Sequence, residues 1–465
     1  MSAATKAATK AGIAGRAARV PWPNVLLSAI ACVSWALTGM AATAALGLHL
    51  LGADAAGSLG PMTAAAVALG AGGSVTPSGD VSAFGLKGAT AHTAIQITPL
   101  GVGLVGALLL SWFFLRSLRA AGVVIAPAEL LARAGAVTAL FVAMLGGLAW
   151  AGHDVVTIDG ASLGLDRLPG GGGGGGSGGL RIPGLGDLGG LLPDNVGKLI
   201  DAKAAVGFRV DTAPTLLGGL AWSAGVLLIS LLASRRTPLP RGWTAVHRVV
   251  RPAVSALVTV LLTAVVAGVA AAGYAAVGDP HPRRIAGAAL LGAPNGVWLG
   301  VPIGLFVPWD GRATGELAKL LPEPLDQLLV AHSDRPVTLA RLADLDGRVW
   351  LLGVAAALMM LLAGVLTAVR TPVLEGARAG TVRGRGALGF VGRCALRLGL
   401  VTAAVLPLLA WLTEVSVNAS LSVLGLDAFG AGVELHGRLG TALLLGAVWG
   451  AGAGAVGALL ATATG

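Results

Sequence analysis

Charged residues are scarce in this chain. Only 12% of its 465 residues are Asp, Glu, Lys or Arg, whereas 55% are hydrophobic and the mean hydropathy is +0.82. Uncharged apolar runs of about 20 residues recur along the sequence, and each is long enough to cross roughly 30 Å of hydrocarbon. A soluble core helix would show a polar face at every turn, and residues 25–51 and 252–277 show none. The sequence therefore predicts an all-α membrane protein.

Cysteine and the motifs of cofactor chemistry are also scarce. The two cysteines, Cys32 and Cys394, lie within or beside apolar segments, which argues against a disulfide and against a thiol-ligated metal. No phosphate-binding loop of the GxxxxGK(S/T) type occurs, and no histidines have His-x-x-x-His spacing. Residues 184–189 match the dinucleotide fingerprint as a string, but no apolar strand precedes them. We therefore expect no cofactor, no metal site and no enzymatic activity.

Eight segments are long and apolar enough to be transmembrane helices. They are approximately residues 25–51, 97–115, 134–152, 214–234, 252–277, 349–369, 394–413 and 439–462.

The net charge of +10 is distributed as a membrane topology signal. With an internal N-terminus and alternating helices, the cytoplasmic stretches hold 18 Lys or Arg against two acids, Glu129 and Glu375, and the external stretches hold 14 against 20. This distribution satisfies the positive-inside rule and predicts that both termini are cytoplasmic. The predicted partner is therefore the lipid bilayer and not a nucleic acid. Arg outnumbers Lys by 26 to 6, which indicates a high-GC genome and a bacterial plasma membrane.

Two further apolar stretches do not fit as ordinary spans. Residues 59–73 are short and end at Gly72 and Gly73, and residues 285–307 are interrupted by Pro294, Asn295 and Gly296. We interpret both as re-entrant or interfacial segments that enter from the external side, because broken backbone at membrane depth survives only inside protein or beside a watery cavity. An ordinary span with a proline kink is the alternative for residues 285–307.

With these two segments set apart, the sequence predicts two parallel four-helix repeats, each with an external re-entrant or interfacial segment. The same order of helix, external segment, helix, helix, external loop and helix fits both halves, so the repeats have the same orientation. The predicted divisions are a basic cytoplasmic N-terminus at 1–24, membrane repeat 1 at 25–235, a basic cytoplasmic linker at 236–251 and membrane repeat 2 at 252–465.

The predicted external parts are a long loop and a charged cap. The loop at residues 153–213 contains seven consecutive glycines, 170–176, and residues 195–208 have the apolar spacing of a short amphipathic helix. The cap, at residues 308–348, is the most charged part of the sequence.

Three stretches of sequence resemble a known family. Residues 72–85 (GGSVTPSGDVSAFG), 97–101 (ITPLG) and 192–208 together resemble the streptophobe family, very hydrophobic multi-pass proteins of Streptomyces and relatives. Residues 292–296 (GAPNG) are similar to a second group of actinobacterial multi-pass proteins. The resemblance implies a membrane location and an actinobacterial source, and it implies no activity.

Two functional hypotheses follow. The first is a permease or channel-like protein for a small solute, whose pathway meets Gly72, Gly73, Pro294, Asn295 and Gly296 at the two breaks. The near absence of charged groups inside the spans disfavours coupled transport through an intramembrane carboxylate. The second is a non-catalytic envelope protein that binds a partner or lipid through its external loops.

Overall fold

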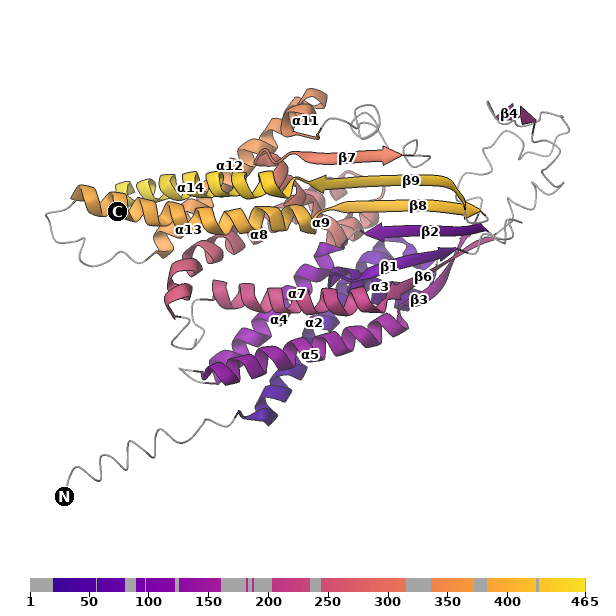
Figure 1. The fold of residues 1–465 in the computed structure, drawn as a ribbon, viewed down its shortest axis with the longest axis horizontal. Helices are drawn as coiled ribbons and strands as arrows, with labels where there is room; N and C mark the ends of the chain where they lie inside the picture. The colour runs from indigo at the N-terminus through magenta and orange to yellow at the C-terminus, as the bar shows by residue number, and fades with distance from the viewer. Residues whose placement is uncertain are drawn as a thin grey trace, which may run out of the picture.

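Figure 1 shows the computed structural model, a bundle of long helices with a β-sheet at one end. The structure describes residues 20–55, 57–79, 89–96, 98–121, 125–159, 181–182, 186–187, 203–234, 244–314, 336–371, 383–423 and 426–464. The glycine run at 170–176, residues 1–19 of the basic N-terminus and residues 236–243 of the predicted linker lie outside these residues.

Among the described residues, nine helices are long and apolar enough to cross a membrane. They are α2 (Trp22–Leu51), α4 (Leu100–Ala120), α5 (Pro127–Ala151), α7 (Thr212–Ala233), α8 (Thr244–Val277), α9 (Pro282–Gly304), α12 (Trp350–Arg370), α13 (Arg383–Leu412) and α14 (Leu439–Thr464). The predicted multi-pass α-helical membrane fold is therefore confirmed. Eight of the helices match the eight predicted spans, although α5, α8 and α13 begin earlier than predicted.

The ninth helix, α9, lies across the end of the bundle that carries the sheet. It contacts α2, α4, α8, α12 and α13. Four of these contacts, in order along α9, are Gly287 with Gly47 of α2, Leu290 with Gly101 of α4, Val297 with Gly268 of α8 and Gly304 with Ala356 of α12. On α2, α4 and α12 the contacted residues are near the helix end that faces the sheet. Because α2 and α4 belong to the first half of the chain, α9 connects the two halves.

The predicted break at Pro294, Asn295 and Gly296 is wrong, because α9 is continuous from Pro282 to Gly304. A proline inside a helix removes one N–H, so the carbonyl of the residue four positions earlier loses its donor. That carbonyl belongs to Leu290, and it lies against the backbone of Gly101 where any side chain would clash. The carbonyl of Leu290 that Pro294 leaves without a donor is therefore packed against α4, and α9 stays helical through Pro294.

Among the described residues, the stretches predicted to be external contain an antiparallel seven-stranded sheet that was not predicted. In spatial order its strands are β3 (His153–Asp159), β6 (Lys203–Asp211), β1 (Ser74–Gly79), β2 (Ala89–Gln96), β8 (Val415–Val423), β9 (Leu426–Gly437) and β7 (Trp309–Thr314). A separate small pair joins β4 (Arg181–Ile182) to β5 (Gly186–Asp187). The sheet contains strands from both halves of the chain.

The predicted amphipathic helix at residues 195–208 is wrong over its described part, because residues 203–208 belong to β6. Phe208 and Val210 recur with the two-residue period of a strand and pack with Val75 of β1 against α3 and α5. In a chain this rich in apolar residues, a short apolar pattern fits both the helical period and the strand period. Pairing with β1 gives this segment the strand conformation.

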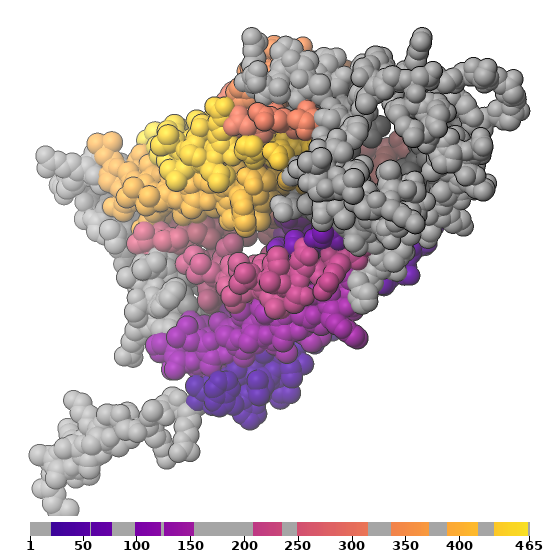
Figure 2. All heavy atoms as spheres, turned by 45° about the vertical axis from the view of Figure 1, so that its right-hand side comes forward, coloured from indigo at the N-terminus to yellow at the C-terminus, as the bar shows by residue number. Residues whose placement is uncertain are grey.

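The two halves of the chain have separate apolar cores and a matching order of elements. One core contains buried residues between Ala29 and Leu227, and the other contains buried residues between Ala253 and Ala453. In Figure 2 the indigo-to-magenta helices of the first half lie below the orange-to-yellow helices of the second.

A local detail supports the predicted repeat. The short helix α3 (Leu59–Gly70) leads to β1 through Gly72, and α9 leads to β7 through Phe306; both residues have positive φ, 82° and 68°. At each corner one N–H bonds to the carbonyl three residues back and the next N–H bonds to the carbonyl five back. The equivalence of α3 and α9 follows, while the full arrangement of the repeats stays a prediction.

Helices α13 and α14 pack with their backbones in contact. Three glycines of α14, spaced by four residues, face three carbonyls of α13, and an added Cβ would come within 2.6 Å of each oxygen. The pairs are Gly446 with Thr402, Gly450 with Leu398 and Gly454 with Cys394. Small residues that allow such close approach are the usual basis of helix association in membranes.

Replacing Gly450 by leucine should therefore destabilise the protein. The new side chain would meet a carbonyl of α13 that cannot rotate away, and overpacking of this kind costs about 1–3 kcal/mol. The matched control is Gly452→Leu, on the same helix, because an added Cβ at Gly452 meets nothing within 4 Å. Thermal unfolding of the purified protein in detergent should show a lower Tm for Gly450→Leu alone. Equal Tm values for the two variants would contradict this packing.

Candidate functional site

The predicted pathway residues of the first half lie in a tight corner. Gly72 has φ of 82° and follows the end of α3, a conformation that favours glycine. Its carbonyl lies against Gly218 of α7, and a Cβ on Gly73 would come within 2.6 Å of Thr215 Oγ1. Both glycines are therefore needed for the close contact between this corner and α7.

The predicted pathway residues of the second half lie in the middle of α9, where Asn295 caps another helix. The backbone N–H of Leu100 donates to Asn295 Oδ1 (3.0 Å), and Asn295 Nδ2 donates to the carbonyl of Thr98 (2.7 Å). Leu100 begins α4, so the amide satisfies one of the donors that a helix N-terminus leaves unpaired. Both polar ends of the Asn295 side chain are thereby engaged with the backbone of the first half.

The two predicted segments meet on opposite sides of the first turn of α4. Gly70, at the end of α3, packs against Val102 and Gly103, while Leu290 of α9 packs against Gly101. Val102 is fully buried between them. The structure thus brings the two predicted breaks near one another, but the space between them is filled by protein.

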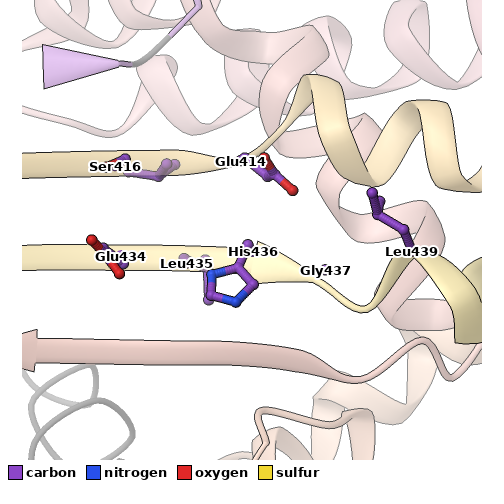
Figure 3. A pocket seen from close by; sticks show the side chains of 8 residues that line it. Glu414, Ser416, Glu434, Leu435, His436, Gly437 and Leu439 are labelled. Atoms are coloured by element: carbon purple, nitrogen blue, oxygen red, sulfur yellow. The ribbon is translucent and has the colours of Figure 1, made fainter.

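A second candidate site, on the sheet, was missed by sequence reasoning. Figure 3 shows Glu414 just before β8, with Glu434 and His436 on the adjacent strand β9, around a shallow hollow. The strand register pairs Ser416 with Glu434, which places Glu414 opposite His436. Burial raises the pKa of the Glu414 carboxyl, and the nearby His436 acts in the opposite direction.

The neighbouring strand β7 extends this polar surface. Its register pairs Asp310 with His436 and Arg312 with Glu434, so these side chains share one face of the sheet. Arg438 donates to both carboxylate oxygens of Asp310, at 2.8–3.1 Å, and this hydrogen bonding lowers the pKa of Asp310. We call Asp310, Arg312, Glu414, Glu434 and His436 the polar face of the sheet.

The opposite face of the same strands is apolar and explains how they are held. Trp309 and Ala313 of β7 are buried together with Val337 and Leu339, and Val433 and Leu435 of β9 pack on this cluster. Alternation of Val415 and Val417, and of Val433 and Leu435, with polar residues is the sequence signal that could have revealed these strands.

The described residues contain no group of three or more His, Cys, Asp or Glu side chains that could hold a metal ion. The polar face combines the carboxylates of Asp310, Glu414 and Glu434 with the side chains of Arg312 and His436. The predicted cap at 308–348 consists, where described, of β7, the short helix α11 (Leu339–Leu345) and the turn before α12, and residues 315–335 lie outside the described range.

Asn295→Leu should lower stability, because it leaves the N–H of Leu100 and the carbonyl of Thr98 without their side-chain partner. Loss of a helix cap of this kind costs about 0.5–2 kcal/mol, and Tm in detergent measures it. Asn295→Asp should restore most of the cap at low pH, where the protonated carboxyl can accept from Leu100 and donate to Thr98, and should lose the donor to Thr98 at higher pH, where the carboxylate only accepts. An unchanged Tm for Asn295→Leu would mean that the cap does not hold α4 to α9.

Comparisons with known proteins yield no relative: no family model, no curated protein and no solved structure matches the chain. The nine apolar helices are thus the evidence for what the molecule is, and they identify it as an integral membrane protein of the multi-pass α-helical class.

Proposed function

We propose that this is a non-catalytic membrane protein that binds a partner through the polar face of its external sheet. The observation that carries the proposal is the pairing of β2 with β8. Eight consecutive residues of β2, Ala89–Gln96, pair with Ser416–Val423 of β8, so strands from the two halves form one sheet. This sheet presents Arg312, Glu434 and His436 on a continuous surface.

The same pairing argues against a transporter that works by alternating access. Such carriers move one repeat against the other around a central site. Here β2 and β8 join the halves at one end of the bundle, and α9 with Asn295 joins them again beneath the sheet. A rocking motion would have to break both connections in every cycle.

A permease for a small solute is the second candidate. The matching order of elements in the two halves favours it, because parallel repeats occur in several transporter folds. Its pathway would have to open where Val102 now separates α3 from α9. No charged side chain described in the structure lies at that point.

The setting of this function is part of the proposal. Charge distribution supports a bacterial plasma membrane with the sheet outside and both termini in the cytoplasm. The resemblance to the streptophobe family and an actinobacterial source fit the same setting, and no catalytic step is proposed.

Cysteine labelling distinguishes the two candidates. In a background with Cys32 and Cys394 replaced by alanine, single cysteines are introduced by Arg312→Cys on the polar face, Val102→Cys between α3 and α9, and Gly278→Cys in the turn between α8 and α9. Arg312 is exposed, Val102 is buried, and a Cβ at Gly278 meets nothing within 4 Å. A membrane-impermeant thiol reagent is applied to intact cells and to purified protein in liposomes.

A bound partner should slow labelling of the Arg312→Cys protein in cells, relative to liposomes, by several-fold. The Gly278→Cys control should label at the same rate in both, and the Val102→Cys protein should not label. Equal rates for Arg312→Cys in cells and liposomes would overturn the binding proposal. Rapid labelling of Val102→Cys would favour the permease.

A further inference from the structure

The last part of α8 is apolar on all sides and is little covered by the rest of the protein. Every residue from Val266 to Val277 is exposed or half-buried, and all of them are Val, Ala or Gly except Tyr274. Earlier in the helix, Ala253 and Val260 are buried in the core of the second half. A helix that is apolar all round is normally enclosed by protein or by lipid. The covering of residues 266–277 therefore comes from outside the chain.

Helices α8 and α9 form a hairpin whose tip lies at the sheet end of the bundle. Val297 of α9 packs on Gly268 of α8, so the two helices run side by side in opposite directions. On its other side, a Cβ at Gly287 of α9 would come within 3.0 Å of Leu51 Cγ, in the last residue of α2. The tip of the hairpin, residues 278–284, is therefore next to the end of α2 from which the chain continues through α3 to the sheet.

The length of α8 places this tip at the membrane surface. The apolar part of the helix, residues 252–277, extends about 39 Å at 1.5 Å per residue, and the hydrocarbon core is roughly 30 Å thick. Tyr274 is one turn from the end of α8 and is 85% exposed. Tyrosine at such a position is typical of the interface between hydrocarbon and headgroups. The tip then reaches the level of the lipid headgroups.

Two neighbouring arginines, Arg283 and Arg284, lie in this tip and are both exposed. The carboxylate of Asp279 is engaged within the turn, because it accepts from the backbone N–H of His281 at 2.7 Å and lies 4.0 Å from His281 Nδ1. Residues 244–314 are described without a gap, and in the described structure neither arginine forms an ion pair. The tip thus presents two guanidinium groups beside one carboxylate.

We propose that the tip of the α8–α9 hairpin is an interaction surface for anionic phospholipids of the outer leaflet, whose phosphates Arg283 and Arg284 bind. A guanidinium presents N–H donors in a planar fork that matches phosphate oxygens. The arrangement of apolar side chains on one part and arginines beside them is that of elements that rest at the membrane interface. This surface is separate from the polar face of the sheet, so it does not depend on the partner proposed for that face.

The apolar side chains beside the arginines favour a lipid over other occupants. Val277 is 87% exposed and Tyr274 is 85% exposed, so both are available to glycerol and acyl groups, which free phosphate lacks. A second copy of the chain is the alternative occupant. A symmetric contact between two tips would bring the same surface of both copies together, arginines included, and like charges repel.

Lipid binding by purified full-length protein in detergent tests the proposal, with phosphatidylglycerol, phosphatidylcholine or inorganic phosphate added separately. Native mass spectrometry counts retained lipids, and the shift of Tm with lipid concentration gives an apparent affinity. Arg283→Gln and Arg284→Gln should each weaken phosphatidylglycerol binding roughly fivefold, because each removes one charge near an anionic headgroup. Val277→Ser combined with Tyr274→Ser, which keeps every charge, should also weaken it.

The matched control is Arg348→Gln, which removes an exposed arginine from the turn before α12, beside Asp346. It should leave phosphatidylglycerol binding unchanged, and phosphatidylcholine and inorganic phosphate should shift Tm little in any variant. Unchanged phosphatidylglycerol binding by the Arg283→Gln, Arg284→Gln double variant would overturn the proposal. Equal weakening by Arg348→Gln would overturn it in favour of diffuse attraction.

Two further results would assign the tip to another occupant. A Tm shift by inorganic phosphate as large as that by phosphatidylglycerol would overturn the lipid as the source of the phosphate. A dimer in native mass spectra that is lost in the double variant, without any loss of retained lipid, would overturn the lipid in favour of a second copy.

Discussion

The pairing of β2 with β8 is the interaction on which the rest of this account depends. Each half of the chain has its own apolar core, so without a connection the halves would be two helical units side by side in a membrane. The pairing of Ala89–Gln96 with Ser416–Val423 joins strands of both halves in one sheet. Within this sheet, the pairing of β8 with β9 places Glu434 beside Ser416, and the pairing of β7 with β9 places Arg312 on the polar face.

Beneath the sheet, close backbone packing holds helices together, both between the two halves and within the second half. The carbonyl freed by Pro294 contacts Gly101, Asn295 caps α4, and Gly446, Gly450 and Gly454 bring α14 onto α13. None of these contacts relies on a hydrophobic force, which is absent between helices in lipid, and all rely on small residues or satisfied polar groups. Gly73 and Asn295, which the sequence analysis placed on a solute pathway, make a close packing contact and a helix cap in the structure.

The sequence predicted the long helices well because twenty uncharged residues have few other solutions in a protein of this composition. It could not predict the sheet, because β1 pairs with β6 and β2 pairs with β8. The paired strands are far apart in the sequence, and local patterns do not show which distant strands pair. For the same reason Asn295 was placed at a break, since its partners at Thr98 and Leu100 are almost two hundred residues away. The polar face escaped notice because Glu414 and Glu434 become neighbours only through strand pairing.

A disulfide across the seam tests the central claim most directly. Ala94 and Asn418 are register partners in the β2–β8 pair, and Ala419 is the next residue along β8. With the native cysteines replaced, the Ala94→Cys and Asn418→Cys pair should oxidise readily in membranes, whereas Ala94→Cys with Ala419→Cys should not, because alternate residues point to opposite faces. Failure of the first pair to form a disulfide, or equal formation by both, would contradict a single sheet that joins the two halves.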